Sequence, residues 1–231
     1  MILLSNIQDG TELLPDSETT EKTLSIIELI SSGGLAGQVI IALLFILLIG
    51  VIYIYFERLF AIKAASNIDS NFMNQIKDHV SNGKIDSAQM LCAQVNTPVS
   101  RLINKGITRI GKPLEDINTA IENAGRLELY GLEKNVSVLA TISSIAPMIG
   151  FLGTVIGMIL SIFEIANSGG QIDIKQLSDG LYTAMTTTVA GLIVGIVAYT
   201  AYNHLVVRTD KVVYQMESNS LEFLDHLNEP I

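Results

Sequence analysis

Three long stretches of this sequence contain no formal charge, and they limit the possible fold more than any other feature. They cover residues 35–56, residues 135–163 between Lys134 and Glu164, and residues 180–207 between Asp179 and Arg208. The hydrocarbon core of a bilayer is about 30 Å thick, and about 20 apolar helical residues cross it. Each stretch reaches that length, so the sequence predicts an integral membrane protein with three transmembrane helices.

The alternation of apolar and polar sequence divides the chain into seven expected segments. They are an N-terminal tail (1–34), a first span (35–56), a polar helical region (57–134), a second span (135–165), a short loop (166–179), a third span (180–207) and a polar C-terminal helix (208–231). Within the tail, residues 23–30 have the pattern of a short amphipathic helix that lies at a membrane surface. The predicted fold class is all-α.

Helix breakers predict further detail. Asn82-Gly83, Thr97-Pro98 and Gly111-Lys112-Pro113 divide the polar region into three or four helices. The second span would be about 45 Å long as one helix. It must therefore tilt, kink at Pro147 or protrude from the bilayer.

The basic residues that flank the spans predict the orientation, because cytoplasmic flanks carry an excess of Lys and Arg. The tail contains only Lys22 before the first span, and the loop between the second and third spans contains only Lys175. The other flanks carry Arg58, Lys63, Arg126, Lys134, Arg208 and Lys211. We therefore expect the N-terminus outside, and residues 57–134 and the C-terminus in the cytoplasm.

Small residues follow one face of each of the last two spans. The second span has Gly150, Thr154, Gly157 and Ser161, and the third has Ala184, Thr188, Gly191, Gly195 and Ala198, all at spacings of three or four residues. Small side chains let membrane helices approach closely. The glycines and Pro147 are therefore predicted helix-packing residues, and tight packing alone would explain them.

Threonines gather beside these faces. Thr183, Thr187 and Thr188 in the third span and Thr154 in the second are candidates to line a narrow, weakly polar pore. A buried threonine can also satisfy itself by bonding the carbonyl one turn back. Spacing alone leaves pore lining and self-satisfaction equally open.

Charge and motifs exclude several functions. The net charge of −9 argues against nucleic acid as the main partner. No phosphate-binding loop, catalytic triad or ligand cluster is visible, so we expect neither an enzyme nor a cofactor. Cys92 is the single cysteine, and the three histidines are scattered.

Glu164 is the only acid within a predicted span, near its outer end, whereas a proton path usually needs ionisable groups inside the membrane.

Two segments carry a resemblance to a known family. APMIGFLGTVIGM at residues 146–158 and AMTTTVAGL at residues 184–192 resemble the motifs in the last two spans of the MotA/TolQ/ExbB proton-channel family. The resemblance runs from about residue 35 to the end of the chain, and ExbB or TolQ fits better than the four-span MotA. Thr183 stands where ExbB and TolQ usually have a glutamate, which leaves the exact subfamily open.

The resemblance implies an assembly in the bacterial inner membrane. In that family, five copies surround two helices of a single-span partner of the ExbD or TolR type, which supplies the proton-carrying aspartate. Thr154 and Thr188 match the family's pore threonines. The implied function is a proton-channel stator that drives a TonB- or TolA-like transducer. The alternatives are a non-conducting membrane scaffold and the stator of another motor, of the Tol, gliding or flagellar type.

Overall fold

The computed structural model describes residues 34–167 and 174–228, and every regular element within these ranges is an α-helix. The helices are α2 (Gly34–Ala65), α3 (Phe72–Ser81), α4 (Ile85–Val95), α5 (Pro98–Ile107), α6 (Leu114–Glu133), α7 (Val136–Asn167) and α8 (Ile174–Asn228). The predicted all-α class is confirmed for this part of the chain. The amphipathic helix expected at residues 23–30 lies outside the described residues.

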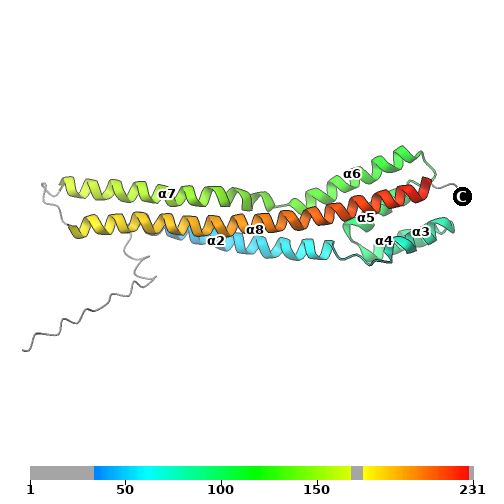
Figure 1. Cartoon of the computed structure of the whole chain (residues 1–231), viewed down its shortest axis with the longest axis horizontal. Helices are drawn as coiled ribbons and strands as arrows, with labels where there is room; N and C mark the ends of the chain where they lie inside the picture. Colours follow the sequence, from blue (N-terminus) through cyan, green and yellow to red (C-terminus); the bar gives the residue numbers. More distant parts are fainter. Residues whose placement is uncertain (1–33, 168–173, 229–231) are drawn as a thin grey trace, which may run out of the picture.

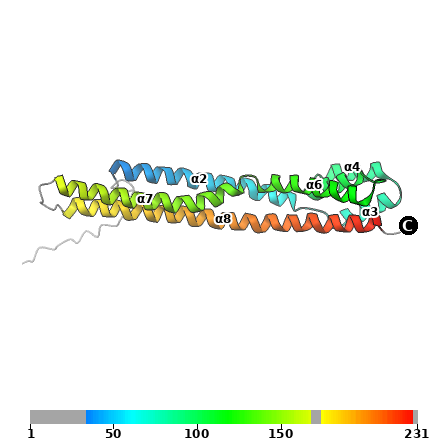
Figure 2. The same ribbon diagram turned by 90° about the horizontal axis from the view of Figure 1, so that it is seen from above.

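Helices α2, α7 and α8 are each long and apolar enough to cross a membrane, as the sequence predicted. They lie side by side and form the three-helix part of an elongated molecule (Figures 1 and 2). The 32 residues of α7 make a helix about 48 Å long, and the 55 residues of α8 one about 80 Å long. Both exceed a bilayer core of about 30 Å. Helix α7 continues through Pro147.

The helices α2 and α8 run beyond the apolar stretches that predicted them. The uncharged sequence ends at residues 56 and 207, yet the helices end at Ala65 and Asn228. Neither extension contains glycine or proline. A change from apolar to charged residues marks the edge of a bilayer, but it does not end a helix when helix formers continue.

The polar region folds into the four helices α3 to α6, and the predicted breakers lie at their ends. Gly83 and Gly111 have φ angles of +68° and +93°, which glycine adopts without strain. Thr97 caps α5 by accepting a hydrogen bond from the Ser100 amide at 3.3 Å, and Pro98 follows at the first turn.

A break that no glycine or proline announces separates α6 from α7. Asn135 adopts the left-handed conformation there, with φ 62°. The buried side chain of Arg58, near the end of α2, donates to the carbonyl oxygen of Gly131 at 3.3 Å in the last turn of α6. A cation at a helix C-terminus is favourable, so this contact holds the end of α2 against the turn between α6 and α7.

Helix α8 connects the two ends of the molecule, because it packs on α2 and α7 and then continues along α3, α5 and α6 (Figure 1). Phe223 is fully buried there, and its ring leaves no room for a side chain at Gly106 of α5. Lys77 of α3 forms an ion pair with Glu222 of α8 at 2.7 Å. One continuous helix therefore joins the apolar helices to the polar helices.

Candidate functional site

Helices α7 and α8 come closest where two glycines meet. A Cβ added to Gly150 would lie 2.7 Å from the carbonyl oxygen of Thr187 and 3.1 Å from Cα of Gly191. A Cβ added to Gly191 would lie 2.6 Å from the carbonyl oxygen of Ala146 and 2.9 Å from Cα of Gly150. These atoms belong to the backbone and cannot move aside alone, so the two helices touch through their main chains.

The two small-residue faces predicted from the sequence lie against each other along this line, which we call the α7–α8 seam. A Cβ at Gly157 would lie 3.3 Å from that of Ala184, and one at Gly195 would lie 2.7 Å from the ring of Pro147. Pro147 lacks an amide hydrogen and leaves the carbonyl of Ser143 without its helical donor. That carbonyl oxygen would lie 3.2 Å from the added Cβ of Gly195.

Thr154 and Thr188 form a reciprocal pair in the middle of the seam. Thr154 Oγ1 donates to the carbonyl oxygen of Ala184 at 3.0 Å, and Thr188 Oγ1 donates to that of Gly150 at 3.2 Å. The two hydroxyls also lie within hydrogen-bonding distance of each other, and because they have two hydrogens between them, only two of these three bonds form at one time. Each threonine thus bonds the carbonyl one helical turn before the other, and both side chains are half-buried.

Nine other serine and threonine hydroxyls of α7 and α8 bond carbonyls of their own helix, whereas Thr209 Oγ1 is buried without a hydrogen-bond partner among the described residues. These bonds are Thr141 to Ser137, Ser143 and Ser144 to Ala140, Ser161 to Gly157, Thr183 to Asp179, Thr186 to Tyr182, Thr187 to Ala184, Thr200 to Ile196 and Ser220 to Met216. Self-satisfaction, one of the two possibilities left open by spacing, therefore explains Thr183 and Thr187, but it does not explain the Thr154–Thr188 pair.

Thr183 and Thr187 are also buried within the single chain. Thr187 has no exposed surface and packs on Gly153, and Thr183 is 8% exposed with its methyl group against Gly37 of α2. Both side chains are therefore enclosed within the chain, whereas Thr154 and Thr188 keep part of their surface exposed. Pore lining stays a prediction for all four threonines.

Some seam residues were absent from the sequence prediction. Gly153 lies beside Thr187, and Gly180 lies against Ser161, where an added Cβ would collide with the serine side chain. Gly180 continues the series of small residues on α8 by one turn, so extending the spacing would have found it. Gly37 lies outside the seam, in α2, where it contacts Thr183, and no series of small residues identified it.

The seam contains hydroxyls but no charge. Residues 135–163 and 180–207 contain no Asp, Glu, Lys or Arg. A hydroxyl donates and accepts hydrogen bonds but does not ionise at physiological pH. Within the described part of the chain, no group of three His, Cys, Asp or Glu side chains could hold a metal ion. The seam can therefore form part of a polar wall, but it contains no acidic or basic side chain of its own.

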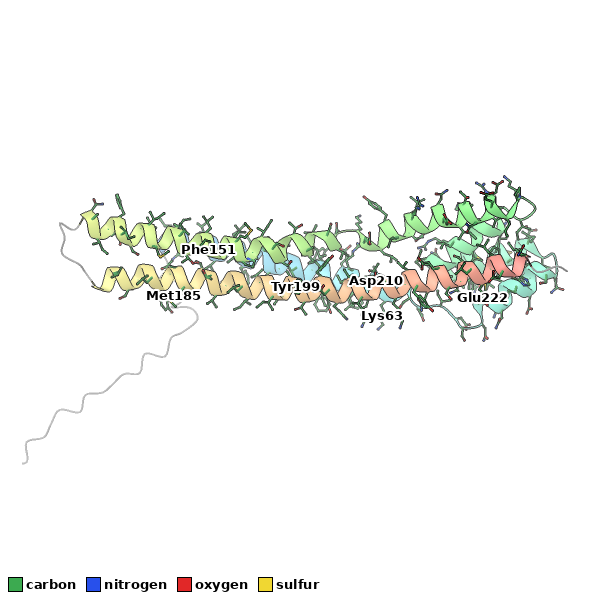
Figure 3. The ribbon with its side chains drawn as sticks, turned by 45° about the horizontal axis from the view of Figure 1, so that its top comes forward. Lys63, Phe151, Met185, Tyr199, Asp210 and Glu222 are labelled. Carbon is green, nitrogen blue, oxygen red and sulfur yellow. The ribbon has the colours of Figure 1, made fainter. Side chains whose placement is uncertain are left out.

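The outer surface of the α7–α8 helix pair is apolar. Phe151 of α7 and Met185 of α8 are 64% and 70% exposed (Figure 3). At the far end of this apolar part, Tyr55 of α2 hydrogen-bonds Nδ1 of His204 at 2.9 Å, and Arg208 Nε donates to its other ring nitrogen. His204 is thus a structural link between α2 and α8.

The three apolar helices define a multi-pass helical membrane protein. The model of the MotA/TolQ/ExbB proton channel family matches residues 94–218, more than half of the chain. The chain belongs to this family, which is one of membrane channel proteins and not of enzymes. The matched range includes all of α7 and the α7–α8 seam.

Curated relatives agree with this assignment. The chain is 24% identical over 196 residues to the putative biopolymer transport protein ExbB homolog of Methanothermobacter thermautotrophicus, covering 84% of this chain and 67% of the relative. It is 28% identical over 210 residues to the Tol-Pal system protein TolQ of Haemophilus influenzae, covering 82% and 87%. It is 41% identical over 88 residues to the putative biopolymer transport protein ExbB-like 2 of Helicobacter pylori, covering 38% and 57%. The predicted similarity to ExbB and TolQ is confirmed.

Proposed function

We propose that this chain is the stator subunit of a proton-driven complex in a bacterial inner membrane. Five copies form a ring, with α7 and α8 of each copy towards the centre. A single-span partner of the ExbD or TolR type occupies the ring and supplies the acidic group that carries the proton. The resulting movement does work on a transducer of the TonB or TolA type, in line with the transport and Tol-Pal names of the relatives.

The reciprocal Thr154–Thr188 pair is the observation that carries this proposal. Hydroxyls buried between membrane helices usually bond their own helix, and the neighbouring threonines do so. This pair instead joins two helices and keeps part of its surface open. A half-exposed polar group inside an uncharged span suits a conduit whose titrating group belongs to another chain.

The proposed orientation places the N-terminus outside and the helices α3 to α6 in the cytoplasm. The positive charges near the spans support it, because Arg58 and Lys63 follow the first apolar stretch and Arg208 and Lys211 follow the third. The buried, unpaired Cys92 of α4 suits a reducing compartment. Helix α8 would then transmit movement from the membrane to the cytoplasmic helices.

The test begins with co-purification of the full chain from its native membrane. We expect a single-span protein with a membrane-embedded aspartate to co-purify, and native mass measurement to give five copies of this chain and two of the partner. The variants Thr154→Val and Thr188→Val remove one hydroxyl each at similar size. Proton-driven transport that persists unchanged in both variants, at normal protein levels, would contradict the proposed role of the pair.

A non-conducting scaffold is the second candidate, and the main-chain contact of Gly150 with Gly191 favours it, because packing alone explains that contact. A scaffold predicts that both valine variants are tolerated, whereas Gly157→Leu or Gly191→Leu prevents assembly. A stator predicts that the leucine variants lose assembly and that the valine variants assemble with strongly reduced proton flux. The valine variants therefore separate the two functions.

A further inference from the structure

We propose that the Thr154–Thr188 pair presents hydrogen-bond acceptors and no free hydrogen to the pore, and therefore binds the protonated form of an acidic group in preference to its carboxylate. The inference rests on the proposed function and names the chemical form of the partner's acid that this site recognises. It follows from counting the hydrogens of the pair and of the hydroxyls around it.

The two hydroxyls take part in three contacts but own two hydrogens. Each hydroxyl has one hydrogen and two lone pairs. If Thr154 donates to Thr188, then Thr188 donates to the carbonyl of Gly150. If Thr188 donates to Thr154, then Thr154 donates to the carbonyl of Ala184. Both hydrogens are engaged inside the seam in either arrangement, and three lone pairs remain to accept.

The neighbouring threonines of α8 supply no substitute donor. Thr183, Thr186 and Thr187 direct their hydrogens to carbonyls of α8. Residues 135–163 and 180–203 contain no Lys, Arg or His. The Tyr182 hydroxyl has no hydrogen-bond partner within the described residues, but its oxygen is buried inside the chain, so it is not available as a donor at the surface where the pair is exposed.

Other titratable groups lie far along the helices. Glu164 is ten residues from Thr154, or about 15 Å along α7, and Asp179 is nine residues from Thr188, or about 14 Å along α8. Helix α2 contributes only Tyr53 and Tyr55 before Glu57. The hydroxyl pair is therefore the polar group that an acid at this depth would meet.

A carboxylate is only an acceptor, whereas a neutral carboxylic acid has an O–H that can donate. Opposite an acceptor-only site, a carboxylate is left without a donor in a medium that penalises unpaired charge. A threonine could donate outward only by giving up its carbonyl or the other hydroxyl. The site thus favours the neutral acid and raises its pKa. The acid takes up a proton before it reaches the pair and releases the proton after leaving.

The substitution Thr188→Asn tests this polarity, because the amide brings two N–H donors that stabilise a carboxylate. The complex of the full chain with its co-purified partner is reconstituted in liposomes, and proton flux is measured against pH. We expect the half-maximal pH of the variant to fall by about one unit. Thr200→Asn is the matched control, because Thr200 is an exposed threonine of α8 that bonds its own helix, and its half-maximal pH should stay unchanged.

An unchanged or higher half-maximal pH in a conducting Thr188→Asn complex would overturn the inference. Thr154→Asn is the second variant if the first does not assemble.

Infrared spectroscopy of the unsubstituted complex at neutral pH tests the protonation of the acid without a flux measurement. A protonated carboxyl band that shifts in Thr154→Ser supports the inference, and a carboxylate band alone contradicts it. A complete absence of proton flux in the unsubstituted complex is a different result, because it defeats the proposed function itself.

Discussion

Thr154 and Thr188 lie opposite each other across the α7–α8 seam, and each hydroxyl lies within hydrogen-bonding distance of the carbonyl oxygen one turn before the other. This arrangement requires two helices whose backbones nearly touch, and Gly150 and Gly191 allow that approach. The close contact of α7 with α8 is therefore needed both for helix packing and for the hydrogen bonding of the two hydroxyls. The glycines set the distance between the helices, and that distance brings the hydroxyls within bonding range.

The two threonines should act as one unit in a double-mutant cycle. We expect Thr154→Val and Thr188→Val each to reduce proton flux by roughly tenfold, the effect of a hydrogen bond worth about 1.4 kcal/mol. The double variant should be little worse than either single variant, because the first substitution already breaks the pair. Flux measured in liposomes at equal protein content checks this. Reductions that multiply would indicate two independent sites.

Gly191→Ala should destabilise the protein, because its Cβ would collide with the carbonyl oxygen of Ala146 and with Cα of Gly150. We expect a loss of about 1–3 kcal/mol, typical of overpacking, measured by unfolding in detergent. Gly50→Ala in α2 is the matched control, because nothing lies within 4 Å of its added Cβ. Equal effects of the two substitutions would disprove the close approach.

The seam also shows how far the sequence could predict this site. The spacing of small residues placed them on one face of each helix, because a helical period relates residues of the same helix. It could not pair Thr154 with Thr188, since the register between two helices depends on the turn and on packing. Thr183 and Thr187 were grouped with them as neighbours in sequence, yet the helix turns both towards buried contacts with Gly37 and Gly153.

In the rest of the fold, the sequence likewise predicted features that local residues determine and missed features that depend on tertiary contacts. Apolar length predicted the three long helices, and glycine and proline predicted three or four short ones. The boundary before the second span was expected at residues 134–135, but a helix break there was not predicted, because it depends on a left-handed asparagine and on the tertiary contact of Arg58 with Gly131. The continuous path of α8 along both ends of the molecule likewise follows from burial of residues such as Phe223.

Phe223→Ala should detach the polar helices from the end of α8. The ring is fully buried against α5 and α6, and its removal should cost about 3–5 kcal/mol. Leu221→Ala is the matched control, because Leu221 is 62% exposed on the same helix. Limited proteolysis should cleave α3 to α6 faster in the first variant alone. Equal cleavage of both variants would show that Phe223 does not anchor this region.

Cys92 should resist alkylation in the folded protein, because burial raises the pKa of its thiol to about 12. The thiolate is the reactive form, so at pH 8 modification should be on the order of a thousandfold slower than after denaturation. The raised pKa also means that its contribution to stability is complete below pH 9 and is lost as pH rises from there towards 12. Ala93→Cys in a Cys92→Ala background gives an exposed control thiol. Rapid labelling of native Cys92 would contradict the burial.

Proton flux into liposomes tests the central claim most directly. The purified chain is reconstituted alone and together with its single-span partner, and acidification is recorded under an imposed potential. Since the seam lacks a titrating group of its own, we expect no flux from the chain alone and clear flux from the complex, abolished by replacing the partner's membrane-embedded acid. Equal flux from the chain alone, or none from a fully assembled complex, would contradict the account.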